Sequence, residues 1–312
     1  MHAEAKSVFR KHQRNFFFKS LILAFKYASK ILPRWFMRFT AIFFSLIFIC
    51  FNVANYRSVR VNMRIIFPDK GSFYTSFLAF RTFLKYAWYL IDLFYLSHGK
   101  DRIKSFRINT VGEENMNEAI GSGHGIILLT LHMGNWEIGG IKLAKTGITP
   151  TIVYFPDSQD IIESQRNRFR SICNIRHVEL GAGRFSSIKL LRILQEGGAV
   201  AIQGDRLQYD RGIEMEMFGH KARFPKGPIM LASAADAVIL PAFVIMEGYN
   251  IYNIYIEKPI SIKVYSNRAE TLGRNLSDII PIFEKYIRKY PDQWYTFMPF
   301  WLKDKKETGN ET

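Results

Sequence analysis

Between Val111 and Asp205 the sequence alternates short apolar runs with amphipathic stretches, and this alternation restricts the fold more than any other feature. The apolar runs have the length and content of buried strands, whereas the stretches between them have helical spacing. Strands that alternate with helices predict an α/β fold with a mixed, mostly parallel central sheet flanked by helices. In chain order the segments read GIILLTL, NWEIGGIKLAK, TPTIVYF, ESQRNRFRSIC, HVELG, SSIKLLRILQEGG and AVAIQGD.

Helices and further strands are predicted outside this region. From Ser72 to Ser97 aromatic and aliphatic residues recur every three to four positions, which predicts a long helix. The segments VILPAFVIM and YNIYNIYIEKPISI read as successive strands. A last helix is expected from about Leu276 to Lys289, because Pro291 stops it.

The N-terminal segment has the composition of a membrane anchor. Its first 38 residues carry nine Lys or Arg and one acid, Glu4, interleaved with aromatic and aliphatic residues. The stretch Phe39–Val53 is uncharged and, with its neighbours, just long enough to cross a bilayer. A crossing helix, a helix lying flat and a buried core helix all remain open. Without a signal cleavage site, we expect permanent attachment. The expected domains are an anchor over 1–60 and a catalytic domain over 61–312.

The overall charge of +16 requires a polyanionic partner, for which nucleic acid, an anionic membrane, an acidic carrier protein and a phosphorylated substrate all qualify. The two cysteines, Cys50 and Cys173, lie far apart and have no zinc-type spacing. We therefore expect a reducing cytoplasmic setting and no metal.

The run Leu131–Glu137, LHMGNWE, follows a predicted strand and opens a predicted helix, where α/β sheets present their reactive groups. His132 and Glu137 would point in different directions on one regular helix. They pair if His132 lies in the preceding turn, which Gly134 allows to bend tightly. Glu137 would then orient the imidazole, leaving its other nitrogen as a general base for a substrate hydroxyl.

In this context HMGNWE resembles the HxGNWE signature of the lipid A biosynthesis (lauroyl/myristoyl) acyltransferase family, which is related to the wider HX4D/E glycerolipid acyltransferases. The resemblance covers most of the chain. Two positions depart from it: Arg206 stands where the family more often has Gln, and the ending 295–299 lacks the usual Trp-x-His-x-Arg pattern. The other matching segments are 62–68 (NMRIIFP), Arg166 and Arg168, 204–206 (GDR), 218–219 (FG), 224–228 (FPKGP), 240–241 (LP) and 291–294 (PDQW).

The resemblance implies transfer of a fatty acyl chain from a thioester donor, acyl carrier protein or coenzyme A, to a lipid or glycolipid hydroxyl. The expected place is the cytoplasmic face of the inner membrane, and no cofactor beyond the acyl donor is expected. Arg166 or Arg168 is expected to stabilise the oxyanion, with a solvated basic face or a phosphate-binding patch as the alternative. Asp205 is expected to orient an arginine or the substrate, unless it is an ordinary turn residue.

Other interpretations remain. The alternative acceptors for the same chemistry are a lysophospholipid, an aminolipid or another glycolipid. A basic membrane-bound scaffold or nucleic-acid binder would use the charge without chemistry, but the sequence contains no nucleic-acid motif. Residues 121–125 (GSGHG) precede a strand and so predict a turn, not a dinucleotide site. His124 and His177 are expected to be ordinary histidines, and no serine has the context of a hydrolase nucleophile.

Overall fold

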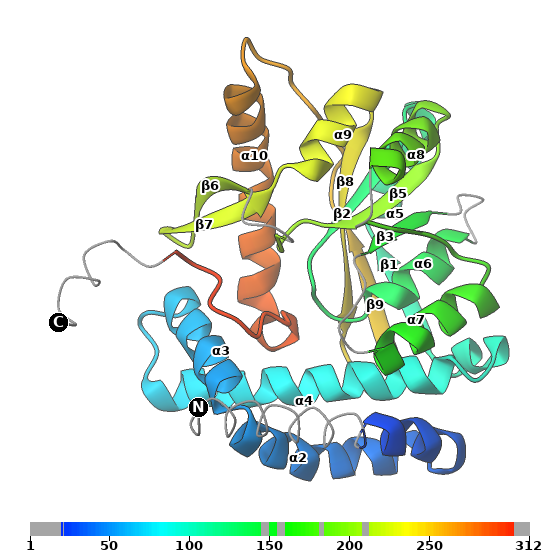
Figure 1. Cartoon of the computed structure of the whole chain (residues 1–312), viewed down its shortest axis with the longest axis vertical. Coiled ribbons are helices and arrows are strands. Elements are labelled where there is room, and N and C mark those ends of the chain that lie inside the picture. Colours follow the sequence, from blue (N-terminus) through cyan, green and yellow to red (C-terminus); the bar gives the residue numbers. More distant parts are fainter. Residues whose placement is uncertain are drawn as a thin grey trace, which may run out of the picture.

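Figure 1 shows the computed structural model of the chain, which describes residues 20, 22–144, 150–154, 160–180, 184–207 and 212–302. The first 19 residues of the predicted anchor therefore lie outside the described residues. The described part is an α/β fold built on an eight-stranded sheet. The bounds of its strands are β1 (Arg107–Val111), β2 (Ile126–Thr130), β3 (Thr151–Tyr154), β4 (Arg176–Glu179), β5 (Ala199–Gln203), β8 (Val238–Met246), β9 (Ile251–Ile256) and β10 (Ile260–Ser261).

The sheet is mixed and mostly parallel, as predicted. Its order is β1-β9-β8-β2-β5-β3-β4, with β10 beside β8. Every pair along this order is parallel except β8 with β9, and β10 also runs antiparallel to β8. The central strands β2 and β5 are therefore parallel neighbours, so the residues that follow them lie at the same edge of the sheet.

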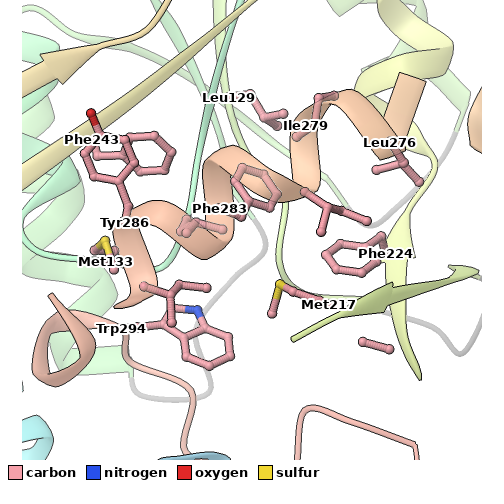
Figure 2. Close-up of a cluster of buried hydrophobic side chains, with 14 of the residues drawn as sticks. Leu129, Met133, Met217, Phe224, Phe243, Leu276, Ile279, Phe283, Tyr286 and Trp294 are labelled. Carbon is pink, nitrogen blue, oxygen red and sulfur yellow. The ribbon is translucent and has the colours of Figure 1, made fainter. Parts of the chain in front are cut away.

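Helices cover both faces of the sheet, because alternate side chains of each strand point to opposite faces. Leu128 of β2 packs in the core that contains residues of α5, α6 and α7. Its neighbours Ile127 and Leu129 pack in the other core, with residues of α8, α9 and α10. Figure 2 shows part of this second core, where the Phe243 ring stacks on Tyr286 of α10 with 4.0 Å between the ring centroids. The helix bounds are α5 (Glu113–Gly121), α6 (Trp136–Ala144), α7 (Asp160–Ile172), α8 (Arg184–Gln195), α9 (Gly227–Ala235) and α10 (Arg268–Lys289).

Residues 22–31 are helical, and the helices α2 (Arg34–Phe51), α3 (Val53–Ile66) and α4 (Ser72–Leu96) follow before the sheet. Helix α4, which fulfils the prediction for this segment, lies crosswise along one edge of the sheet in Figure 1, and α2 lies on its far side. Of the described helices, α2 is the one long and apolar enough to cross a membrane by length and composition. Residue 60, the expected domain division, falls within α3.

Two features differ from the expectations. A hairpin of β6 (Gly212–Met217) and β7 (His220–Pro225) forms a separate two-stranded sheet that no pattern had indicated. The last helix begins at Arg268, two turns before the predicted start, because Asn267 caps it by accepting a bond from the Glu270 amide. Its first turns contain few apolar residues, so periodicity alone does not reveal them.

Candidate active site

His132 lies in a tight turn between β2 and α6. Gly134 has a φ of +60°, and a Cβ there would come within 1.8 Å of the Val244 carbonyl oxygen. The Asn135 amide donates to the same oxygen at 2.9 Å. Only glycine fits this position, and the bend it permits brings the imidazole to the end of the sheet as the sequence predicted.

The C-terminal segment holds this turn in place. The Tyr295 amide donates to the His132 carbonyl oxygen at 2.8 Å, and the Gly134 amide donates to the Gln293 carbonyl oxygen at 2.9 Å. Met133 and Trp294 form an isolated antiparallel bridge between these contacts. The backbone around His132 is therefore fixed from both sides.

Asp205, which follows β5, is the carboxylate that contacts the catalytic candidate. Its Oδ1 lies 2.7 Å from Nδ1 of His132, and both of its oxygens accept from the His132 amide. The indole Nε1 of Trp294 donates to Oδ2 at 2.9 Å. Asp205 is buried, so these donors replace the water it loses. The sequence analysis expected Asp205 to orient an arginine or the substrate. In the structure Asp205 contacts His132 itself.

The predicted contact between Glu137 and His132 is wrong in this structure. Both oxygens of Glu137 are bound to Arg170 of α7, at 2.6 Å to Nη2 and 3.1 Å to Nε. Glu137 and Arg170 are both buried, and Glu163 lies 3.4 Å from the same guanidinium. The cause is the direction of the Glu137 side chain, which extends from the first turn of α6 toward Arg170 on the neighbouring helix α7. This contact ties α6 to α7.

Burial and charge favour a neutral imidazole beside an ionised carboxylate. Burial lowers the pKa of His132; Asp205 opposes this effect and Arg206 adds to it. Burial by itself would raise the pKa of Asp205, but His132, Arg206 and Trp294 together lower it to about 2. Since Asp205 is then an acceptor only, Nδ1 of His132 carries the hydrogen and Nε2 carries the lone pair.

The two predicted arginines lie in different places. Arg166 lines the cavity beside His132, with its guanidinium over the Trp136 ring and its Nε donating to Tyr89 at 3.1 Å. Arg168 instead donates to the Ser97 carbonyl oxygen at 2.9 Å, and it is absent from the residues that line this cavity. The structure therefore brings only Arg166 to the site.

A cavity of about 550 Å³ opens beside the imidazole. It follows the face of the sheet covered by α5, α6 and α7, and its lining is mainly apolar with cations near His132. A largely apolar cavity with few polar groups is typical of a binding site for an apolar ligand. Its lining includes Leu128, Ala201, Ala242, Val244, Ile254, Ile256, Met116, Glu113, Tyr86, Arg166 and Arg206.

Sequence reasoning missed two contributors to the site, Trp294 and Arg170. Trp294 belongs to a segment with a family resemblance, but nothing local indicated that its indole reaches Asp205. Arg170 lies in the same Arg-rich helix as Arg166, one turn further on, which was the signal available. In the described part of the chain, no group of three or more His, Cys, Asp or Glu is arranged to hold a metal ion.

A partly exposed histidine with a buried carboxylate partner at a strand end, open to an apolar cavity, fits the acyltransferase class, and comparison with protein families agrees. Residues 4–303 match the model of the bacterial lipid A biosynthesis acyltransferases. The match covers nearly the whole chain, and the chain belongs to this family.

The individual relatives have low sequence identity with this chain, and the similarity covers less of it than the family match does. The phosphatidylinositol mannoside acyltransferase of Mycobacterium tuberculosis is 25% identical over 199 residues, 63% of this chain and 61% of that protein. The protein of the same name from Mycolicibacterium smegmatis is 23% identical over 200 residues, 64% of each chain. The chain thus spans somewhat less than two thirds of these relatives' length. The crystal structure of the 1-acyl-sn-glycerophosphate (LPA) acyltransferase PlsC from Thermotoga maritima has a TM-score of 0.41 and 17% identity, over 82% of this chain and 98% of that one.

Proposed function

We propose that the chain transfers a fatty acyl group from a thioester donor to a hydroxyl of a membrane lipid or glycolipid, with His132 as the general base. The observation that carries the proposal is the contact between Asp205 and His132, a residue that lines an apolar cavity. The contact fixes the tautomer that can accept a proton at Nε2, and the cavity suits an acyl chain.

The reaction follows from these groups. Nε2 of His132 takes the proton of the acceptor hydroxyl while its oxygen attacks the thioester carbonyl carbon. Asp205 stabilises the imidazolium that forms, as a triad carboxylate does. The tetrahedral intermediate then expels the thiolate, which takes the proton from the imidazolium and leaves as the free thiol.

The oxyanion of the intermediate needs positive charge or hydrogen-bond donors. The amides of the turn are engaged: Met133 donates to Leu131, Gly134 to Gln293 and Asn135 to Val244. The guanidinium groups that line the cavity near His132 supply the charge instead, and Arg166 and Arg206 are the residues concerned. Arg206 is anchored by a bond to the Tyr295 carbonyl oxygen.

The donor and the place of reaction are parts of the same proposal. A net charge of +16 favours an acidic acyl carrier protein over coenzyme A as the docked donor. The relatives named as phosphatidylinositol mannoside acyltransferases favour a sugar-bearing lipid as the acceptor class. We place the reaction at the cytoplasmic face of the inner membrane, where acyl thioesters are available to a cytoplasmic domain.

The test is lipid mass spectrometry with purified protein, bacterial membrane lipids and either acyl carrier protein or coenzyme A thioesters. Wild type should produce a lipid heavier by one acyl chain, and His132→Ala should not. His177→Ala is the matched control, because His177 is exposed on β4 and should leave the product unchanged. Equal product from His132→Ala and wild type, or none from wild type with any donor, would overturn the proposal.

A further inference from the structure

Helix α2 buries its polar side and exposes its apolar side. Apart from Met37, the residues it buries are charged or small: Arg34, Arg38, Ala41 and Ser45. A water-facing helix shows the opposite pattern. The outer face carries large apolar side chains that are each 38–62% exposed: Trp35, Phe36, Phe39, Phe43, Phe44, Leu46, Ile47 and Phe51. We call these eight residues the apolar stripe.

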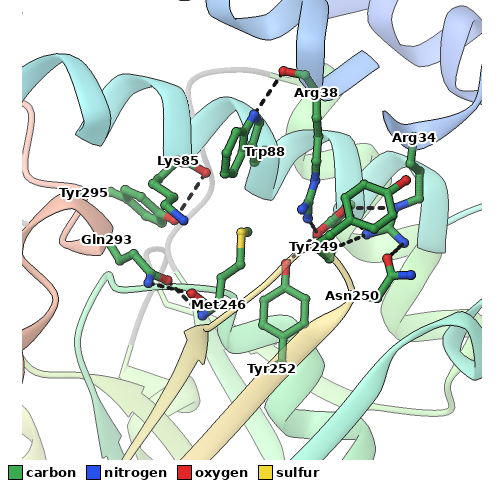
Figure 3. Close-up of polar contacts among 11 residues, drawn as sticks. Arg34, Arg38, Lys85, Trp88, Met246, Tyr249, Asn250, Tyr252, Gln293 and Tyr295 are labelled. Carbon is green, nitrogen blue, oxygen red and sulfur yellow. Dashed lines mark hydrogen bonds and ion pairs between the residues drawn. The ribbon is translucent and has the colours of Figure 1, made fainter. Parts of the chain in front are cut away.

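A buried ion network holds α2 against the rest of the fold. Asp92 of α4 is fully buried, and its carboxylate contacts Arg34 at 2.7 Å and Arg38 at 2.5 Å. Figure 3 shows both arginines reaching from α2 toward the turn between β8 and β9, where Asn250 accepts from Arg34 at 2.8 Å. Tyr252 of β9 donates to the same carboxylate. If α2 left this position, buried charges would lose their partners.

The form of the stripe agrees with a helix that lies flat. It runs along one side of α2 from Trp35 to Phe51, about 24 Å at 1.5 Å per residue. A helix that crosses a bilayer on its own meets lipid all round, whereas the other side of α2 is covered by α4. An exposed apolar face on a helix with a protein-bound polar side is the arrangement of an interfacial helix.

The charge around the stripe matches an anionic surface. Within the described residues 20 and 22–90, Asp69 is the one exposed acid. Exposed cations lie on both flanks of α2 in the sequence: Lys30, Arg57, Arg64 and Lys70. Each lysine or arginine near a negatively charged leaflet adds attraction, so acidic lipid headgroups are the partner that this region fits.

We propose that α2 lies in the plane of one leaflet, with the apolar stripe among the acyl chains and α4 on the water side, and that the partner is a bilayer with anionic headgroups. The inference deepens the proposed function and rests on its membrane location. It excludes a crossing α2, because Arg34 and Arg38 bind the buried Asp92 of α4 and so hold the start of the helix against the rest of the fold.

This placement brings the reaction centre near the headgroups. Helix α4 contacts α2 through the Trp88 indole, which donates to the Arg38 carbonyl oxygen at 3.2 Å. Tyr86, on the same helix, lines the cavity that contains His132. About one helix diameter, roughly 10 Å, therefore separates the leaflet from the site.

Spin-label depth measurements test the proposal on the full chain in phosphatidylglycerol/phosphatidylethanolamine vesicles. Cys50 is exposed on α2 and serves as one site in Cys173→Ser protein. Phe39→Cys, Phe43→Cys and Ile47→Cys, each in Cys50→Ser/Cys173→Ser protein, supply the others. Relative access to oxygen and to a water-soluble nickel complex gives the depth of each label. All four sites should lie at one shallow depth, roughly 5–10 Å below the headgroups.

A depth that changes steadily from residue 39 to residue 50, by up to about 16 Å, would indicate a crossing helix and overturn the proposal. Labels without oxygen contact would also overturn it, because residues 1–19 or a second copy of the chain would then cover the stripe. Ile188→Cys on α8, an exposed apolar position away from α2, is the control that should stay in water. The depths should be unchanged in His132→Ala protein, so a failure of the catalytic proposal is read separately.

Vesicle composition tests the partner. Sedimentation should retain more protein on vesicles that contain phosphatidylglycerol than on phosphatidylcholine alone, and salt should reduce the difference. Equal binding to both would overturn the assignment of anionic headgroups.

Discussion

Asp205 accepts the Nδ1 hydrogen of His132 at 2.7 Å, although 73 positions separate the two residues in the chain. Parallel pairing of β2 with β5 brings them together, because each residue follows one of these strands. The buried carboxylate fixes the ring and opposes the effect of burial on its pKa. In the proposed mechanism Asp205 takes the orienting role that the spacing of His132 and Glu137 had suggested for Glu137.

Asp205→Asn should lower kcat by about 10²- to 10⁴-fold, the usual contribution of an oriented general base, with a much smaller change in KM. The side chain keeps its size, but it no longer stabilises the imidazolium. The measurement is steady-state acyl transfer at saturating donor. Asp236→Asn is the matched control, because Asp236 pairs with His124 at 3.3 Å on the surface. A kcat within a few-fold of wild type for Asp205→Asn would rule out the orienting role.

The acidic limb of the rate profile should respond to the two charged neighbours of His132 in opposite directions. In the proposed mechanism the neutral ring is the active base, so the rate should fall as pH drops through its pKa, which burial holds below the usual 6.5. Asp205 raises this pKa, so Asp205→Asn should move the limb to lower pH. Arg206 lowers it, so Arg206→Gln should move the limb to higher pH. The measurement is kcat/KM against pH, and shifts in the same direction for both variants would contradict this account.

The sequence predicted the sheet and the tight turn that carries His132, because both depend on local pattern. Strands such as Ile126–Thr130 are short and apolar, and the turn at Gly134 has one steric solution. The sequence could not identify Asp205 as the partner of His132, because long-range packing sets the strand order that brings the two residues together. The carboxylate of Glu137, five residues after His132, was the candidate that local spacing indicated. The hairpin over 212–225 was missed because its exposed strands contain charged residues in place of an apolar run.

Glu137→Gln should destabilise the fold more than it slows the reaction. Replacing Glu137, the closer partner of this buried ion pair, leaves Arg170 with Glu163 at 3.4 Å as its remaining counter-charge, at a cost of up to about 3–5 kcal/mol. Urea unfolding measures the stability, and kcat per folded molecule measures the chemistry. Glu196→Gln is the control: its exposed pair with Arg192 on α8 should contribute no more than about 0.5 kcal/mol. Wild-type stability with a large loss of kcat would instead make Glu137 catalytic.

Asp92→Asn should also destabilise the fold by about 3–5 kcal/mol, because Arg34 and Arg38 then share a neutral partner in a buried place. The loss should be largest in detergent, where no bilayer supports α2. The measurement is the unfolding midpoint in detergent and in vesicles. A midpoint equal to that of wild type in both media would show that the network does not hold α2 in place.

Ala242→Phe should shorten the acyl chain that the protein accepts. Ala242 is on β8 and lines the cavity. Strand β8 lies between β2, which leads to His132, and β9, which carries the lining residue Ile256. A phenyl ring there closes off the part of the cavity beyond β8. Each methylene that loses its apolar contact costs about 0.8 kcal/mol, or roughly fourfold in kcat/KM. The measurement is kcat/KM across a series of acyl donors, whose maximum should move to shorter chains. Ala234→Phe on the exposed side of α9 is the size-matched control. An unchanged maximum in Ala242→Phe would mean that the acyl chain lies elsewhere than along this face of the sheet.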